Sequence, residues 1–93
     1  MSWENQIKQF RYYLKIERSL SPNSILAYSQ DLEKLSKYCQ KVFPGILPTQ
    51  VTLDHLRSFI HDLSSVEISV FSQARIISGI KAFFKYLMYE EQL

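Results

Sequence analysis

The residues with the clearest chemical potential stand at one predicted helix start, Ser21-Pro22-Asn23-Ser24. Ser21 can cap the helix, and Pro22 suits the first helical position because no backbone N–H is needed there. The short polar side chains of Ser21, Asn23 and Ser24 then crowd the first turn. A helix N-terminus carries partial positive charge and free N–H donors, so this turn is suited to an anion such as phosphate.

A second group of candidate contact residues lies on a predicted helix from about Val70 to Glu90. Its apolar spacing predicts a broad core-facing side, formed by Ile76, Ile77, Ile80, Phe83, Phe84, Leu87 and Met88. The opposite side is then predicted to hold Arg75, Ser78, Gly79, Ala82, Lys85 and Tyr86, with Lys81 at the boundary. Small residues rimmed by cations would let this helix approach a bulky anionic surface such as a DNA groove. The alternative is that Gly79 and Ala82 admit a neighbouring helix.

The sequence offers little support for catalysis or for a bound metal. His55 and His61 are six residues apart, whereas two ligands on one helix face need a spacing of three or four. One cysteine and two histidines do not make a zinc site. The sequence has no glycine-rich loop and no nucleophile-elbow pattern. We therefore expect no catalytic residue, no metal, no cofactor and no small-molecule substrate.

Length and composition bound the class of protein. Ninety-three residues predict one domain, spanning 1–93, and 46% apolar residues are typical of a globular chain. The single Cys39 cannot form an internal disulfide and suits a reducing cytoplasm. No apolar run approaches the length of a membrane span, so no membrane partner is expected.

The arrangement of charge is more informative than its sum. A formal net charge of +2 does not by itself indicate nucleic acid. Basic residues nevertheless recur at helical spacing in two stretches, Lys8, Arg11, Lys15 and Arg18, and Lys34, Lys37 and Lys41. Each stripe is either a contact surface or an ordinary solvated helix face.

Four helices must position these residues, which predicts an all-α fold, a small bundle of four main helices. The first runs from about Trp3 to Arg18 and the second from Pro22 to about Gln40. The third spans about 53–64, and 42–51 is a loop because it holds two prolines and a glycine. Predicted caps are Ser2, Ser21, Thr52 and Ser69. The core faces of the first three helices are predicted to be Trp3, Ile7, Phe10 and Leu14; Ile25, Tyr28, Leu32, Leu35 and Cys39; and Leu53, Leu56, Ile60 and Leu63.

Three ordered groups of residues resemble the N-terminal core-binding domain of tyrosine recombinases, especially the XerC/XerD type. The first group is Phe10, Tyr13, Leu14, Glu17, Arg18 and Leu20, and the second is Ser21, Asn23, Ser24, Tyr28, Asp31 and Leu32. The third is Arg75, Ile77, Ser78, Ile80, Lys81, Phe83, Phe84, Tyr86 and Leu87. Ser24 stands where threonine is usual, and Lys81 stands where arginine is commoner. The order and spacing of these groups make the resemblance fairly specific.

The resemblance implies a SAM-like domain that forms half of a clamp around duplex DNA, with its second and fourth helices facing the major groove. It implies DNA contact by Ser21, Asn23, Ser24, Arg75, Ser78, Lys81 and Lys85. Lysine lacks the planar fork that reads guanine, so Lys81 favours phosphate contact over base readout.

The resemblance also implies partners and a setting. The catalytic domain would lie C-terminal to Leu93 and be absent from this chain. Other recombinase protomers would be partners, and the setting would be the bacterial cytoplasm and nucleoid. The alternative function is a helical protein–protein interaction module with no nucleic-acid role, in which Gly79 and Ala82 dock a partner helix.

Overall fold

A computed structural model of the chain describes residues 2–66 and 68–91. Four α-helices follow one another, α1 (Trp3–Ile16), α2 (Pro22–Val42), α3 (Leu53–Ser64) and α4 (Val70–Glu91), with a short 3-10 helix, η1 (Pro48–Gln50), before α3. The described residues contain no strand, so the predicted all-α fold with four main helices is confirmed. Helix α1 ends two residues earlier than predicted because the chain soon reverses at Ser19, which has a left-handed φ of 51°.

Each helix begins at the serine or threonine that the sequence predicts as its cap. The cap hydroxyl accepts the backbone N–H three residues later in every case: Ser2 from Asn5, Ser21 from Ser24, Thr52 from His55 and Ser69 from Ser72. These bonds satisfy donors that have no partner within the helix. The four helix starts are therefore fixed by local sequence.

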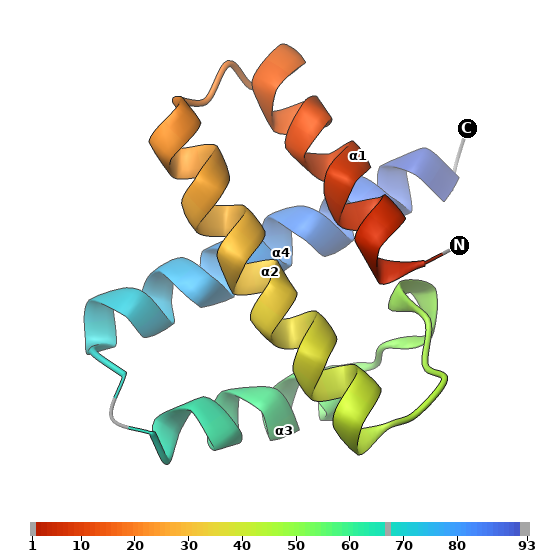
Figure 1. Cartoon of the computed structure of the whole chain (residues 1–93), viewed down its shortest axis with the longest axis vertical. Coiled ribbons are helices and arrows are strands. Elements are labelled where there is room, and N and C mark those ends of the chain that lie inside the picture. Colours follow the sequence, from red (N-terminus) through yellow and green to blue (C-terminus); the bar gives the residue numbers. More distant parts are fainter. Residues whose placement is uncertain (1, 67, 92–93) are drawn as a thin grey trace.

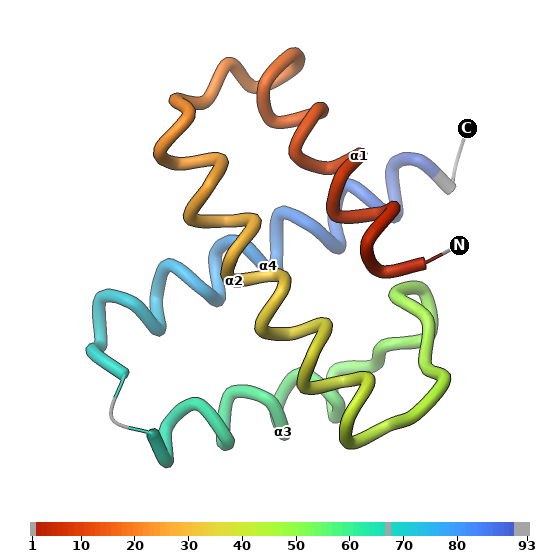
Figure 2. Tube along the Cα trace, viewed as in Figure 1, coloured from red at the N-terminus to blue at the C-terminus, as the bar shows by residue number. Residues whose placement is uncertain are grey.

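The helices form a flat molecule with extents of 35 × 29 × 18 Å. Viewed down the short axis, α1 and α2 lie in front of α4, and α3 runs along the lower edge (Figure 1). The trace in Figure 2 shows the reversal between α1 and α2 at one corner and the longer connection from α2 to α3 at the opposite one. Helix α2 packs against each of the other three helices, so it is the central element.

Aromatic side chains join α1 to α4. The ring of Phe83 stacks on Trp3 and meets Phe10 edge-on, with a centroid distance of 5.4 Å to Phe10. The indole Nε1 of Trp3 donates a hydrogen bond of 2.9 Å to the backbone oxygen of Ile46. The start of α1 is thereby held against both α4 and the loop that precedes α3.

The predicted core faces of α1 and α2 are confirmed, and that of α3 is partly wrong. All four predicted α1 residues are buried, as are Leu32, Leu35 and Cys39 of α2. On α3, Leu53 is 62% exposed, whereas Phe59, which was not predicted, is buried. Helix α3 packs mainly on α2 rather than on two neighbours, so its inner face turns toward Phe59 and Leu63.

The predicted outer face of α4 is wrong at three positions. Gly79 and Tyr86 are buried and Ala82 is half-buried, while Met88, predicted to be in the core, is 63% exposed. The physical reason is that α4 is crossed by α2 and also meets the aromatic side chains of α1, which turns its buried side toward Gly79 and Tyr86. Gly79 therefore admits a neighbouring helix of the same chain.

Candidate nucleic-acid interface

The contact between α2 and α4 is close because position 79 has no side chain. A β-carbon built on Gly79 would lie 3.0 Å from Cδ1 of Tyr28, which is tighter than ordinary van der Waals contact. The ring of Tyr28 therefore rests directly on the α4 backbone. Glycine costs a helix roughly 1 kcal/mol relative to alanine, and here the close approach of the two helices offsets that cost.

An ion pair fixes the same crossing one turn away. Nε and Nη2 of Arg75 each donate to one carboxylate oxygen of Asp31, both at 2.9 Å. The Asp31 side chain is 1% exposed and that of Arg75 is 44% exposed. The hydrogen bond and the charge of Asp31 raise the pKa of Arg75 above its already high value. One edge of this guanidinium, formed by Nε and Nη2, is thus committed to α2, so Arg75 positions the helices.

A hollow of about 380 Å³ opens where the end of α1, the following turn, α2 and α4 meet. Its cationic side chains are Arg18, Lys81 and Lys85, and we call it the basic cleft. The remaining lining residues are Tyr13, Leu14, Leu20, Tyr28, Ala82, Tyr86 and Tyr89. Among the described side chains no carboxylate pairs with Lys81 or Lys85. The cleft therefore presents three cations from two distant stretches of sequence.

The polar turn at the start of α2 stands next to this cleft along the helix. Ser24 precedes Tyr28 by four residues, so both side chains lie on one helix face, one turn apart. The hydroxyl of Ser21 donates to Oγ of Ser24 at 3.1 Å while accepting the Ser24 N–H. Ser21 and Asn23 are exposed and Ser24 is half-buried.

The predicted contact residues of α4 divide into two sets. Ser78, Lys81 and Lys85 are exposed, and both lysines line the basic cleft. Arg75 is held by Asp31 at the edge of the same helix face. The sequence alone did not predict that Arg18 joins the two lysines, because the reversal at Ser19 brings it there.

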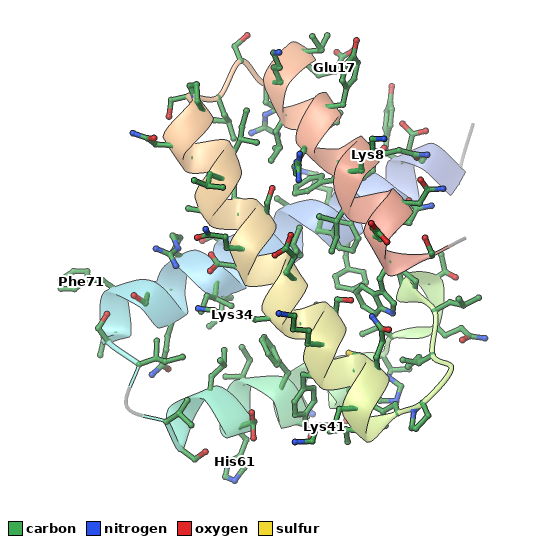
Figure 3. The ribbon with its side chains drawn as sticks, viewed as in Figure 1. Lys8, Glu17, Lys34, Lys41, His61 and Phe71 are labelled. Carbon is green, nitrogen blue, oxygen red and sulfur yellow. The ribbon has the colours of Figure 1, made fainter. Side chains whose placement is uncertain are left out.

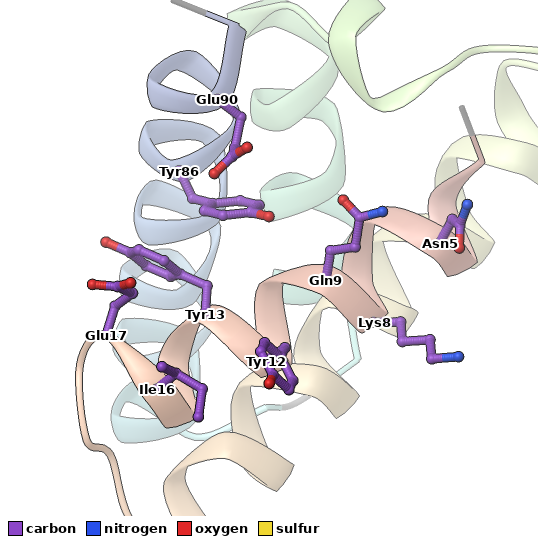
Figure 4. A pocket seen from close by; sticks show the side chains of 9 residues that line it. All are labelled: Asn5, Lys8, Gln9, Tyr12, Tyr13, Ile16, Glu17, Tyr86 and Glu90. Atoms are coloured by element: carbon purple, nitrogen blue, oxygen red, sulfur yellow. The ribbon is translucent and has the colours of Figure 1, made fainter. Parts of the chain in front are cut away.

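A second hollow, of about 620 Å³, lies on the other side of the Tyr13–Tyr86 pair (Figure 4). We call it the acidic pocket because Glu17 and Glu90 border it beside the two tyrosine rings. Its other lining residues are Asn5, Lys8, Gln9, Tyr12 and Ile16, and the amine of Lys8 points away from the rings. Burial first, and then the charge of Glu90, raise the pKa of Tyr86. Tyr86 is therefore a protonated, buried residue that lines both hollows. It does not lie on the exposed side of α4, where its spacing predicted it.

The two basic stripes are exposed on α1 and α2. Lys8, Arg11 and Lys15 border a groove of about 650 Å³ between these helices. Arg18, predicted to continue this stripe, lines the cleft instead. Lys34 and Lys41 project from α2 into solvent (Figure 3).

Residues 2–66 and 68–91 give little support for a metal site, a membrane-spanning helix or a reactive thiol. No group of three or more histidine, cysteine or acidic side chains in this part of the chain is arranged to hold a metal ion. The helices described here also include none with the length and apolar character needed to cross a membrane. Burial raises the pKa of Cys39 to about 11, so its thiol stays protonated near neutral pH.

Together these features define a small helical domain with a cationic cleft. Residues 7–91 match the family described as phage integrase, N-terminal SAM-like domain, and the chain belongs to this family. The predicted resemblance and the SAM-like class are thereby confirmed. No solved structure gives a significant match to the chain.

Curated relatives are tyrosine recombinases. The chain is 34% identical over 84 residues to tyrosine recombinase XerC of Pseudomonas savastanoi, which covers 90% of this chain and 28% of that protein. It is 31% identical over 88 residues to tyrosine recombinase XerD of Chlorobaculum tepidum, and the match covers 95% of this chain and 28% of that protein. It is 38% identical over 85 residues to tyrosine recombinase XerC of Leptospira interrogans, and the match covers 90% of this chain and 27% of that protein. The chain thus spans little more than a quarter of the length of these relatives.

Proposed function

We propose that this chain is the DNA-binding module of a site-specific tyrosine recombinase. It contacts duplex DNA through the first turn of α2, with Ser21, Asn23 and Ser24, and through the exposed face of α4. The contact residues proposed on α4 are Ser78, Lys81 and Lys85, with Arg75 at the edge. The observation that carries the proposal is the meeting of Arg18, Lys81 and Lys85 at the basic cleft, in a chain of the recombinase N-terminal family.

Phosphate contact is the favoured mode of binding. Ammonium groups are compact point charges that suit phosphate oxygens, while base reading by paired hydrogen bonds needs the arginine fork. The Nε–Nη2 edge of Arg75 is engaged by Asp31 at 2.9 Å, and two of the three cations of the basic cleft, Lys81 and Lys85, have no such fork. The cleft therefore positions the duplex and supplies only a small part of sequence recognition.

The chemistry of recombination is assigned to a longer parent protein. The relatives are more than three times the length of the matched region, so a parent of that size has room for a catalytic domain. That domain would lie C-terminal to Leu93 and supply the catalytic residues. We assign no catalytic residue to this chain, and we propose other recombinase protomers as its partners on DNA in the bacterial nucleoid.

The alternative function, a module that docks a partner helix on Gly79 and Ala82, is not supported because these two residues do not form an exposed surface. Gly79 is buried beneath Tyr28 of the same chain, and Ala82 packs at the edge of the core.

A salt titration of duplex binding tests the proposal. Fluorescence anisotropy with a short mixed-sequence duplex should give an affinity that falls with salt, with a log–log slope of roughly 0.9 for each phosphate contact. The double variant Lys81→Ala, Lys85→Ala should bind more weakly and lose roughly two units of that slope.

The matched control removes the same charge from the far end of α2. Lys37 and Lys41 are exposed, so Lys37→Ala, Lys41→Ala changes the net charge equally without touching the basic cleft. Its slope should stay close to that of the wild type. Undetectable duplex binding at low salt, or equal losses in both double variants, would contradict the proposal.

A further inference from the structure

The turn after α3 and the start of α4 carry three exposed apolar side chains, of which Val70 and Phe71 are the most exposed of the described molecule. Val66 is 58% exposed, Val70 79% and Phe71 89%. The Phe71 ring extends from the start of α4 away from every helix (Figure 3). Isolated exposed apolar residues are common on protein surfaces, so the position of Phe71 decides whether it has a role.

Phe71 lies on the same face of α4 as the proposed DNA contacts. Arg75 follows Phe71 by four residues, Ser78 follows Arg75 by three, and Lys85 follows Ser78 by seven. Residues at these spacings lie on one side of a helix. Phe71 to Lys85 is fourteen residues, or roughly 21 Å at 1.5 Å per residue. The exposed face is thus one continuous strip with an aromatic ring at its N-terminal end and ammonium groups further along.

The charge of this strip indicates which kind of partner it can bind. Arg75 is paired with Asp31, but among the described side chains no carboxylate pairs with Lys81 or Lys85, so the strip complements a polyanion. A helix that enters a major groove presents its N-terminal residues to the base edges, while residues further along reach the backbone. On such a helix Phe71 would face bases and the lysines would face phosphates.

We propose that Phe71 packs against thymine 5-methyl groups in the major groove and gives the domain a preference for thymine-containing sites. This inference rests on the proposed DNA-binding function. The thymine methyl is the apolar group that base edges offer in that groove, whereas the other exposed groups there are hydrogen-bond donors and acceptors. An aromatic side chain offers a large apolar face to such a group, and lysines supply none of this selectivity.

Removing the methyl from DNA tests the contact without knowledge of the natural site. Duplexes of alternating adenine and thymine are compared with duplexes of alternating adenine and deoxyuridine, which differ only by that methyl. Wild-type chain should bind the thymine duplex about fourfold more tightly per contacted methyl, the factor for burying one methyl group. In Phe71→Ala this ratio should fall to one, and Phe71→Leu should keep part of it.

Tyr12→Ala is the matched control, because Tyr12 is an exposed aromatic residue, 68% accessible, on α1. It should keep the wild-type ratio. An unchanged ratio in Phe71→Ala, or no discrimination by the wild type, would overturn the role of Phe71 and leave the proposed function standing. Absence of binding to either duplex would overturn both. Sedimentation that reveals Phe71-dependent self-association without DNA would assign the ring to a protein contact and refute the inference.

Discussion

The two hollows beside the C-terminal half of α4 share one wall and carry opposite charge. Tyr13 and Tyr86, whose ring centroids are 4.8 Å apart, line both. On one side the basic cleft holds three cations, and on the other the acidic pocket holds Glu17 and Glu90 beside the rings. The cleft requires α2, whereas the pocket is lined by residues 5–17 and by α4.

This difference teaches that charge placement decides where a polyanion can approach. Glu17 and Arg18 are neighbours in sequence, yet they border opposite sides of the tyrosine wall. A net charge of +2 conceals this separation. Charges act mainly within a screening length of about 10 Å at 0.1 M salt, so the local sign outweighs the total.

Breaking the Asp31–Arg75 pair should have the largest effect, because it holds α2 in place over the cleft. Arg75→Ala leaves a carboxylate buried without its partner and should lower the free energy of unfolding by about 4 kcal/mol. Asp31→Ala should cost less, about 3 kcal/mol, because the remaining guanidinium is 44% exposed and can be hydrated. Denaturant unfolding followed by the fluorescence of the single Trp3 measures both.

The double variant Asp31→Ala, Arg75→Ala serves as the control for this pair. It leaves no unpaired charge and should be more stable than Arg75→Ala alone. If the two single variants cost the same and their effects add, the pair does not hold the helices as described.

Reversing the charge of the cleft should have the next largest effect. Lys81→Glu, Lys85→Glu replaces the two proposed phosphate contacts by repulsion and should weaken duplex binding roughly a hundredfold at low salt. Stability should change little, since both lysines are exposed. Anisotropy titration measures the duplex affinity, and thermal unfolding of the same samples measures the stability, so the two effects can be separated. A loss of binding that merely follows a loss of folding would argue against the cleft as the binding surface.

A methyl group at Gly79 should disturb the cleft wall and leave the acidic pocket intact. Gly79→Ala pushes on the Tyr28 ring, and the overpacking cost of about 1–3 kcal/mol is partly offset by roughly 1 kcal/mol of helix propensity. We expect a net destabilisation of about 1 kcal/mol in denaturant unfolding. In a Tyr28→Ala background the same change should become stabilising. Ser78→Ala, on the exposed face of α4, is the control and should be stabilising by a few tenths of a kcal/mol through helix propensity alone.

Neutralising the acidic pocket should have the smallest effect. Glu17→Gln, Glu90→Gln removes two negative charges behind the tyrosine wall and should strengthen duplex binding about twofold, because these charges act only at a distance and through solvent. The gain should disappear at high salt. An affinity gain as large as the loss from the cleft reversal would mean that total charge, rather than its placement, controls binding.

Local features of the fold were predictable from sequence. The caps at Ser2, Ser21, Thr52 and Ser69 depend on hydrogen bonds that span only three residues. The core faces of α1 and α2 follow from helical spacing, because each helix packs along one continuous apolar side. The exposed lysines of α4 were predicted on the same basis.

Contacts between helices were not predictable in the same way. The spacing of α4 predicts one apolar side, but the crossing of α2 adds Gly79 to the buried surface, and a glycine contributes nothing to an apolar pattern. Asp31 and Arg75 each resemble ordinary surface residues until α2 and α4 bring them together. Arg18 joins the cleft only because the backbone reverses at Ser19.

The close approach at Gly79 also constrains how this domain can change between lineages. A side chain at position 79 requires a smaller or displaced group in place of the Tyr28 ring, so these two positions are expected to change together. Asp31 and Arg75 are coupled through charge, since changing either one alone leaves the other without its partner. Lys81 and Lys85 face solvent and are free to exchange with other cations one at a time. Paired substitution at the crossing and single substitution on the exposed face would be the evolutionary record of this architecture.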